Sequence, residues 1–223
     1  MATVCIIILG FLIGNFLKAY ADCIERSKYL IESKLDYTND VCIGQKLSLT
    51  SIGTGIGFGM IYSQFGKSME MIIGCTFVCF TMLLTIIDWK YMILPTFIIR
   101  WGMGIGVVGR LLQASLLENR EILTESLLGA VIGYLLFMSV FYGSWWMLKK
   151  EGLGYGDVRF MGMIGIYVGS HRIFLTILLA SLLASLYGIV LLKIKGRSEP
   201  YPLGPFLSIG GLITFLWGSF IGQ

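Results

Sequence analysis

Long apolar runs follow one another along almost the whole chain, and they constrain its fold more than any other feature. A membrane-spanning helix needs about 20 mostly apolar residues. Charged residues make up only 13% of the sequence, whereas soluble domains contain about 25%. Seven runs are long enough or nearly so, and an eighth, 158–170, is short and rich in glycine; the seven are 3–20, 48–66, 69–87, 97–117, 126–148, 173–194 and 203–221. The sequence therefore predicts an all-α polytopic membrane protein with about eight transmembrane helices.

The positions of Lys and Arg predict the orientation of these helices. Cytoplasmic segments of membrane proteins carry an excess of positive residues. No charged residue precedes Lys18, so the first run is interpreted as a retained helix with its N-terminus outside rather than as a cleaved signal peptide. Eight helices then place all but four of the 17 Lys and Arg inside. The four predicted to lie outside are Lys67, Arg110, Arg120 and Arg172. In this arrangement 21–47 is a short cytoplasmic segment after the first helix.

Several classes of function are disfavoured by the remaining residues. The net charge is only +4 and the basic residues form no dense patch, which argues against nucleic-acid binding. The five cysteines form no CxxC pair, so a zinc site is not expected. The GxGxxG match at 104–109 lies inside an apolar run, which indicates close helix packing rather than dinucleotide binding. His171, the only histidine, is expected outside and remote from the acidic residues discussed next.

Two aspartates lie at ends of apolar runs on the same predicted face. Asp88 ends the third run, and Asp157 follows a glycine-rich turn and precedes the short one. Each aspartate could simply cap or terminate a helix. Alternatively, they could form a pair: two carboxylates held close at low dielectric share a proton, so one can activate water while the other polarises a carbonyl. Gly154 and Gly156 would then allow close approach of backbone and substrate, and Pro95 would fix the chain direction where the fourth helix begins.

These residues resemble a known family. Gly154-Tyr155-Gly156-Asp157 matches the GxGD motif of membrane-embedded aspartic proteases. Asp88 through Pro95, and 152–159, resemble the two motifs of bacterial prepilin peptidases, also called type IV leader peptidases. The segments 10–17 and 202–207 are similar to that family's N-terminal signature and its late proline-glycine-proline turn. Because four motifs follow in order along nearly the whole chain, the resemblance is more specific than GxGD alone.

The resemblance implies an eight-helix membrane aspartic endopeptidase with its active site at the cytoplasmic face. Residues 1–223 would form a single membrane domain, with a protease core over 69–223. Asp88 and Asp157 would be the catalytic pair. Substrates would be prepilins or pseudopilins, cut after a glycine between a short basic leader and an apolar helix. The enzyme would lie in the bacterial inner membrane, surrounded by lipid, and would need no cofactor for proteolysis.

The chain departs from the family pattern in its first polar segment. Many members carry paired CxxC motifs there, linked to zinc and to N-methylation of the new N-terminus. Here the segment holds only Cys23 and Cys42, and Lys18 stands where the family usually has Asn. We therefore expect no metal site and no N-methyltransferase activity; S-adenosylmethionine would be required only if that activity were retained.

Two alternative functions use the same aspartates. A presenilin-like protease would cut within a substrate's transmembrane helix, but the short spacing from Asp88 to Pro95 and the late turn at 202–206 favour prepilins. An ion-coupled transporter would bind protons or cations at Asp88 and Asp157. The absence of a detectable inverted repeat in the sequence counts against transport.

Overall fold

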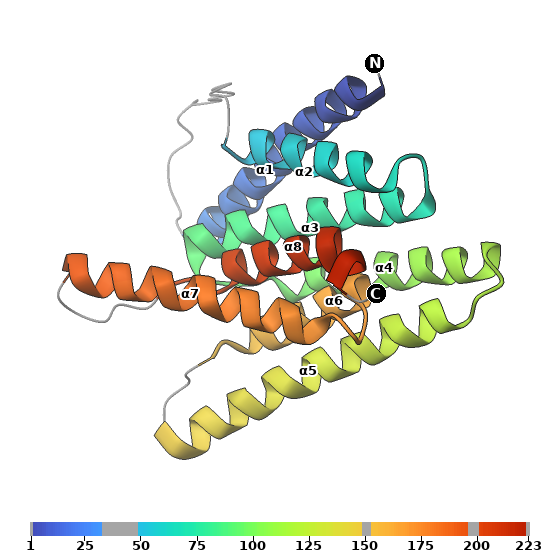
Figure 1. The fold of residues 1–223 in the computed structure, drawn as a ribbon. Helices are drawn as coiled ribbons and strands as arrows, with labels where there is room; N and C mark the ends of the chain where they lie inside the picture. The colour runs from blue at the N-terminus through green and yellow to red at the C-terminus, as the bar shows by residue number, and fades with distance from the viewer. Residues whose placement is uncertain (1, 33–48, 149–152, 196–200, 222–223) are drawn as a thin grey trace.

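The computed structural model describes residues 2–32, 49–148, 153–195 and 201–221, and this part of the chain contains eight helices and no strand (Figure 1). The helices are α1 (Ala2–Glu32), α2 (Leu49–Phe65), α3 (Met69–Tyr91), α4 (Thr96–Leu116), α5 (Glu121–Leu148), α6 (Tyr155–Val168), α7 (Ile173–Lys195) and α8 (Gly204–Ile221). The prediction of an all-α fold is confirmed.

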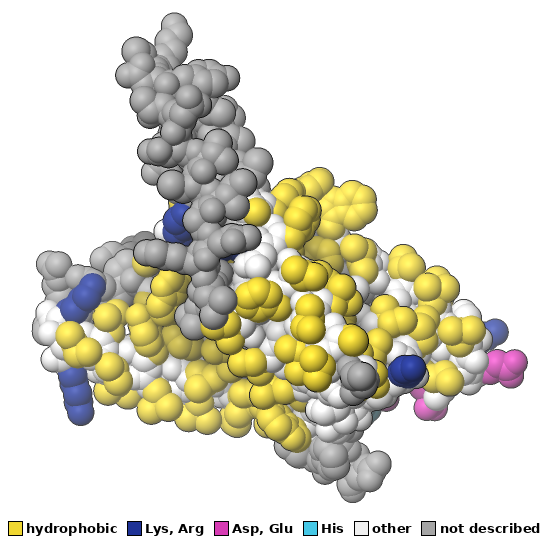
Figure 2. Space-filling view, turned by 90° about the horizontal axis from the view of Figure 1, so that it is seen from above, with side chains coloured by type: hydrophobic (Ala, Val, Ile, Leu, Met, Phe, Trp, Pro, Cys, Tyr) yellow, Lys and Arg dark blue, Asp and Glu magenta, His cyan; other side chains and the backbone are white. Residues whose placement is uncertain are grey.

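Four of these helices are long and apolar enough to cross a membrane: 2–21 within α1, 69–91, 121–146 and 173–195. Their outward surfaces carry large exposed side chains such as Leu12, Ile72, Leu128 and Leu182, which water would not favour. Figure 2 shows hydrophobic side chains over most of the visible face. The chain is therefore a multi-pass membrane protein. That α2, α4, α6 and α8 also cross, and that the N-terminus lies outside, stay predictions.

The structure describes only the start of the first polar segment. Residues 21–47 are predicted to be a short cytoplasmic segment, and α1 continues into it as far as Glu32. Residues 33–48, with Cys42, lie outside the described residues, as does the side chain of Cys23.

The short helix α6 lies at the centre of the fold. Every residue from Phe160 to Val168 is buried, with α3, α4, α5 and α8 around it (Figure 1). It packs most closely against α5, where a Cβ added at Gly129 would lie 2.5 Å from the Gly165 carbonyl oxygen. In a membrane the hydrophobic effect does not drive helices together, so they associate through close contacts between backbones such as this one.

The glycine motif at 104–109 is a packing surface only in part. A Cβ at Gly106 would lie 2.9 Å from the Tyr167 ring, and one at Gly109 would lie 3.2 Å from Ile73, whereas one at Gly104 would meet no atom within 4 Å. Close packing is thus confirmed for Gly106 and Gly109, and it is wrong for Gly104.

One end of the bundle gathers the helix ends that the sequence singled out. There α3 ends, α4 begins after a four-residue turn, and α6 and α8 begin beside them. We call this the aspartate end, because Asp88 lies in the last turn of α3 and Asp157 in the first turn of α6.

Candidate active site

Asp88 is buried at the aspartate end, with only 4% of its surface exposed. Its Oδ2 accepts a hydrogen bond of 2.8 Å from the backbone N–H of Gly204, the first residue of α8. The first N–H groups of a helix have no partner within the helix, and its N-terminus carries a partial positive charge. The start of α8 therefore supplies both a donor and a favourable field to the Asp88 carboxylate.

The turn from α3 to α4 places Pro95 where the sequence predicted it. Met92 ends α3 in the left-handed conformation, with φ 53°, and its N–H donates to the Asp88 carbonyl at 2.8 Å. Pro95 then stands at the N-cap position of α4 with φ −65°, the value that its ring imposes. Leu94, which lies between them, is buried and faces Gly156 at the start of α6. The turn therefore packs the end of α3 against the start of α6.

Asp157 lies in the first turn of α6 and is half-buried. The N-cap of α6 is Gly154, whose carbonyl accepts the Asp157 N–H at 3.0 Å. The simple interpretation of Asp157 as an N-cap is therefore wrong: the helix begins three residues earlier than predicted from the apolar run. Its carboxylate instead complements the positive helix start from within the first turn.

Both glycines of the GxGD motif lie where a side chain would collide. A Cβ added at Gly154 would lie 3.0 Å from Asp157 Oδ2, and one at Gly156 would lie 2.9 Å from the Leu94 Cβ. The first contact shows that the Asp157 carboxylate turns back over the glycine loop. The second shows that α6 approaches the α3–α4 turn as closely as a glycine permits.

The two carboxylates are close enough for the charge of Asp88 to act on Asp157. The fold thus brings together both aspartates predicted to pair, along with Pro95, Gly154 and Gly156. A buried and a half-buried carboxylate in electrostatic contact favour a shared proton. One ionised and one protonated acid can act as general base and general acid on a single substrate.

The contact between Gly204 and Asp88 was not predicted from the sequence. The motif around it at 202–207 was recognised, but its partner Asp88 is 116 residues away. A Cβ at Gly204 would lie 2.6 Å from Asp88 Oδ2. The signal in the sequence was a glycine between two prolines at the start of an apolar run. It indicates that another part of the chain comes close to this backbone, but it does not identify that part.

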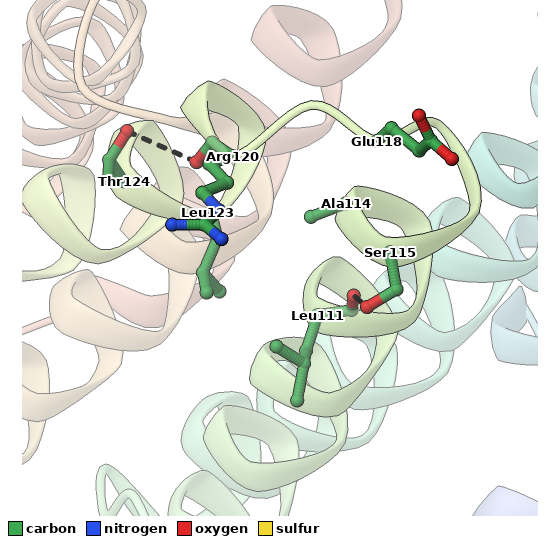
Figure 3. A pocket seen from close by; sticks show the side chains of 7 residues that line it. All are labelled: Leu111, Ala114, Ser115, Glu118, Arg120, Leu123 and Thr124. Atoms are coloured by element: carbon green, nitrogen blue, oxygen red, sulfur yellow. Dashed lines mark hydrogen bonds between the residues drawn. The ribbon is translucent and has the colours of Figure 1, made fainter.

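Other candidate groups lie far from the pair. His171 is 3.6 Å from Glu125 just beyond the C-terminal end of α6, remote from the aspartates as predicted. A cavity of about 570 Å³ lies where α4 ends and α5 begins, lined by Leu111, Ala114, Ser115, Glu118, Arg120, Leu123 and Thr124 (Figure 3). It is separated from the aspartate end by the length of α4, roughly 30 Å. Among the described residues no group of three His, Cys, Asp or Glu could hold a metal ion.

Comparison with known proteins gives a consistent set of relatives. A family model described as the type IV leader peptidase family matches residues 75–189, which include both aspartates. The chain is 31% identical over 183 residues to the prepilin leader peptidase/N-methyltransferase of Pseudomonas aeruginosa, covering 79% of this chain and 60% of that protein. No solved structure matches the chain.

Proteins with the same name in two other genera are also similar. The relative from Aeromonas salmonicida is 36% identical over 143 residues, which are 62% of this chain and 46% of that protein. The relative from Xanthomonas campestris is 33% identical over 148 residues, which are 63% and 48%. The chain thus spans about half to three fifths of the length of these relatives.

Proposed function

Because the chain belongs to the type IV leader peptidase family, we propose that it is an aspartic endopeptidase that removes the leader from type IV prepilin-like proteins. One observation carries this proposal: Asp88 and Asp157, 69 residues apart in the chain, lie at the same end of the bundle, where α3 ends and where Gly156 at the start of α6 meets Leu94 of the α3–α4 turn. The names of the relatives support a prepilin or pseudopilin as the substrate.

The reaction needs only the groups at the aspartate end. The ionised member of the pair takes a proton from a water molecule, which attacks the scissile carbonyl, while the protonated member donates to the carbonyl oxygen. The Gly204 amide holds the Asp88 carboxylate in place. The absence of side chains at Gly154 and Gly156 lets the Asp157 carboxylate turn back over the loop and lets α6 approach the α3–α4 turn, which holds Asp157 near the end of α3.

The aspartate end faces the cytoplasm of a bacterial cell, with the protein in the inner membrane. The distribution of Lys and Arg supports this orientation: the sequence predicts an excess of them on that face, and two of those counted, Lys193 and Lys195, lie in the last turn of α7. A prepilin with its basic leader in the cytoplasm and its apolar helix in the bilayer presents its cleavage site at this depth.

We propose no cofactor for the proteolysis. The relatives' names include an N-methyltransferase activity, but we do not extend it to this chain. The segment in which the family carries paired CxxC motifs holds only Cys23 and Cys42 here, so the ligands of that zinc site are missing. S-adenosylmethionine would serve only that second activity.

The test is cleavage of a prepilin-like peptide by the protein reconstituted in lipid vesicles, with Asp88→Asn and Asp157→Asn as variants. Each change should lower kcat by a factor on the order of 10² to 10⁴, because one carboxylate cannot act as both acid and base. Glu121→Gln, an acid at the other end of the bundle, is the matched control and should cleave normally.

Two results would contradict the assignment. Near-normal cleavage by either Asp→Asn variant would show that the pair is not the catalytic group. A solute flux across the vesicles that is lost in the same two variants, without cleavage by the unmodified protein, would instead indicate an ion-coupled transporter.

A further inference from the structure

A second cavity lies at the aspartate end of the bundle, and the proposed reaction does not use it. Its volume is about 230 Å³, and it lies between α4, α5 and α6. It is lined by Thr96, Ile99, Arg100, Met103, Tyr134 and Arg159. Two arginines and two residues with hydroxyl groups therefore line one small space, and none of its described lining residues is acidic.

Arg159 is held in a defined orientation within this cavity. Its guanidinium group stacks over the Tyr155 ring, with 4.3 Å from Cζ to the ring centroid, and its Nη1 donates a hydrogen bond to Thr96 Oγ1. The hydroxyl of Tyr155 in turn lies 3.1 Å from that of Tyr134. Because a guanidinium has five N–H donors, most of them remain available after the contact with Thr96.

Arg100 has no partner in the described part of the chain. The ion pairs found there join Arg110 to Glu70 and His171 to Glu125. Arg100 is exposed on α4, four residues or roughly 6 Å along the helix axis from its start. Since side chains of a helix tilt toward its N-terminus, and α4 and α6 both begin at the aspartate end, Arg100 and Arg159 both extend toward the membrane surface there.

The cavity opens toward lipid rather than toward the catalytic pair. Arg100 is flanked on α4 by Phe97 and Trp101, which are 65% and 57% exposed, as expected of a lipid-facing surface. Residues 157 and 159 point to nearly opposite sides of a helix, about 200° apart. Arg159 thus faces α4 and α5, whereas the Asp157 carboxylate lies over Gly154.

A lipid-facing site with two positive charges and no acid among its described lining residues favours an anionic ligand from the membrane. Unpaired charge at this depth is costly, and guanidinium groups bind phosphate through paired hydrogen bonds. Basic pockets between membrane helices bind anionic headgroups for these reasons. We propose that the cavity binds the phosphate group of an anionic phospholipid through Arg100 and Arg159, with the hydroxyls of Thr96 and Tyr134 at its edge.

The test measures binding rather than cleavage, so its outcome is independent of the proposed protease function. Purified protein in a neutral detergent is titrated with phosphatidylglycerol, phosphatidylcholine or inorganic phosphate, and binding is followed by native mass spectrometry and by the thermal unfolding midpoint. Phosphatidylglycerol should bind saturably and raise the midpoint. Binding should weaken about tenfold or more in Arg100→Gln, because a charge-assisted contact is lost.

Matched variants separate this site from general attraction to charge. Arg120→Gln removes an arginine at the other end of the bundle and should leave phosphatidylglycerol binding unchanged. Arg100→Lys keeps the charge without the planar fork and should bind with intermediate affinity. Met103→Trp fills the cavity while retaining both arginines, so it carries the test should Arg100→Gln fail to fold, and it too should lower the affinity.

Three results would overturn the proposal. Equal phosphatidylglycerol binding by the unmodified protein, Arg100→Gln and Met103→Trp would place the lipid elsewhere. Inorganic phosphate that binds as tightly as phosphatidylglycerol would indicate a site for a soluble anion. A raised KM for peptide cleavage in Arg100→Gln with unchanged lipid binding would assign the cavity to a carboxylate of the substrate.

Discussion

The contact between α8 and Asp88 gives the sharpest test of the site. In Gly204→Ala the new Cβ would lie 2.6 Å from Asp88 Oδ2, whereas ordinary contact begins near 3.4 Å. The carboxylate oxygen must therefore move by about 0.8 Å, or α8 must retreat by as much; a displacement near 1 Å costs about 10²-fold in rate where catalysis depends on orientation. The backbone of Gly204 lies outside the left-handed region, so alanine causes no backbone strain there.

The hydrogen bond leads to a similar magnitude. The 2.8 Å contact from the Gly204 N–H to Asp88 lies on the same side of the carboxylate as the new methyl group. A hydrogen bond to a charged group contributes about 1.5–3 kcal/mol, which corresponds to a change of about 10- to 150-fold at 1.36 kcal/mol per factor of ten. We expect kcat for a prepilin-like peptide to fall about 100-fold, with KM changed much less, because the role proposed for Asp88 is at the scissile bond.

The assay compares kcat, KM and the thermal unfolding midpoint of Gly204→Ala with those of Gly104→Ala. Position 104 is the matched control, since a Cβ there meets no atom within 4 Å and alanine favours a helix interior. It should cleave at the normal rate. If Gly204→Ala folded normally and kept its kcat within about threefold of the unmodified protein, a difference below 1 kcal/mol, the amide would not be positioning Asp88.

Three further outcomes follow from the packing and the chemistry. Gly165→Ala should destabilise the protein by about 1–3 kcal/mol, measured as a lower unfolding midpoint, because the Cβ would lie 2.5 Å from the Gly129 carbonyl carbon; Gly143→Ala, which meets no atom within 4 Å, should not. Arg110→Leu should cost about 2–3 kcal/mol in the same measurement, less than a fully buried pair because the Glu70 side chain is 31% exposed; a smaller loss in the Glu70→Leu background would confirm the coupling. A strong chelator should leave peptide cleavage unchanged if the two carboxylates act without a metal, and loss of activity restored by added metal would refute this.

The helices were largely predictable because their apolar runs are long and end in polar residues. The runs 69–87 and 173–194 became Met69–Tyr91 and Ile173–Lys195. Where the helix bounds differ from the predicted runs, the helix continues through polar residues that the apolar pattern alone would place outside it. Asp88 remains in α3 because α8 supplies a partner for its carboxylate, and Asp157 belongs to α6 because its charge suits a helix start.

The polar contacts between helices were not predictable, since they depend on residues far apart in sequence. Arg110 was assigned to the outer face by counting charges, but it is buried within α4 with 8% exposure. It donates to Glu70 at 2.8 Å, to Gln113 at 2.9 Å and to the Tyr167 carbonyl. A rule based on the distribution of Lys and Arg treats every cation as solvated, so it does not detect one whose charge is compensated within the bundle.

The lengths of the helices also set the depth of the two aspartates. The Tyr155 ring at the start of α6 lies 5.7 Å from Phe141, and α5 continues for seven residues to Leu148, roughly 10 Å. The Phe206 ring in the first turn of α8 lies 5.3 Å from Tyr187, and α7 continues for eight residues to Lys195, roughly 12 Å.

Figure 1 shows α5 and α7 extending past the starts of α6 and α8, so both aspartates are set back from the ends of these two helices. A polypeptide that entered from the membrane surface would need about three extended residues on each side of the scissile bond to reach them, at about 3.3 Å per residue. A substrate whose apolar helix lies in the bilayer needs such a segment only on its leader side, because the helix itself already holds the other side at that depth. If the aspartates cleave as proposed, their distance from the helix ends favours membrane-anchored substrates over soluble peptides of the same sequence, through helix lengths that no residue of the two aspartate motifs specifies.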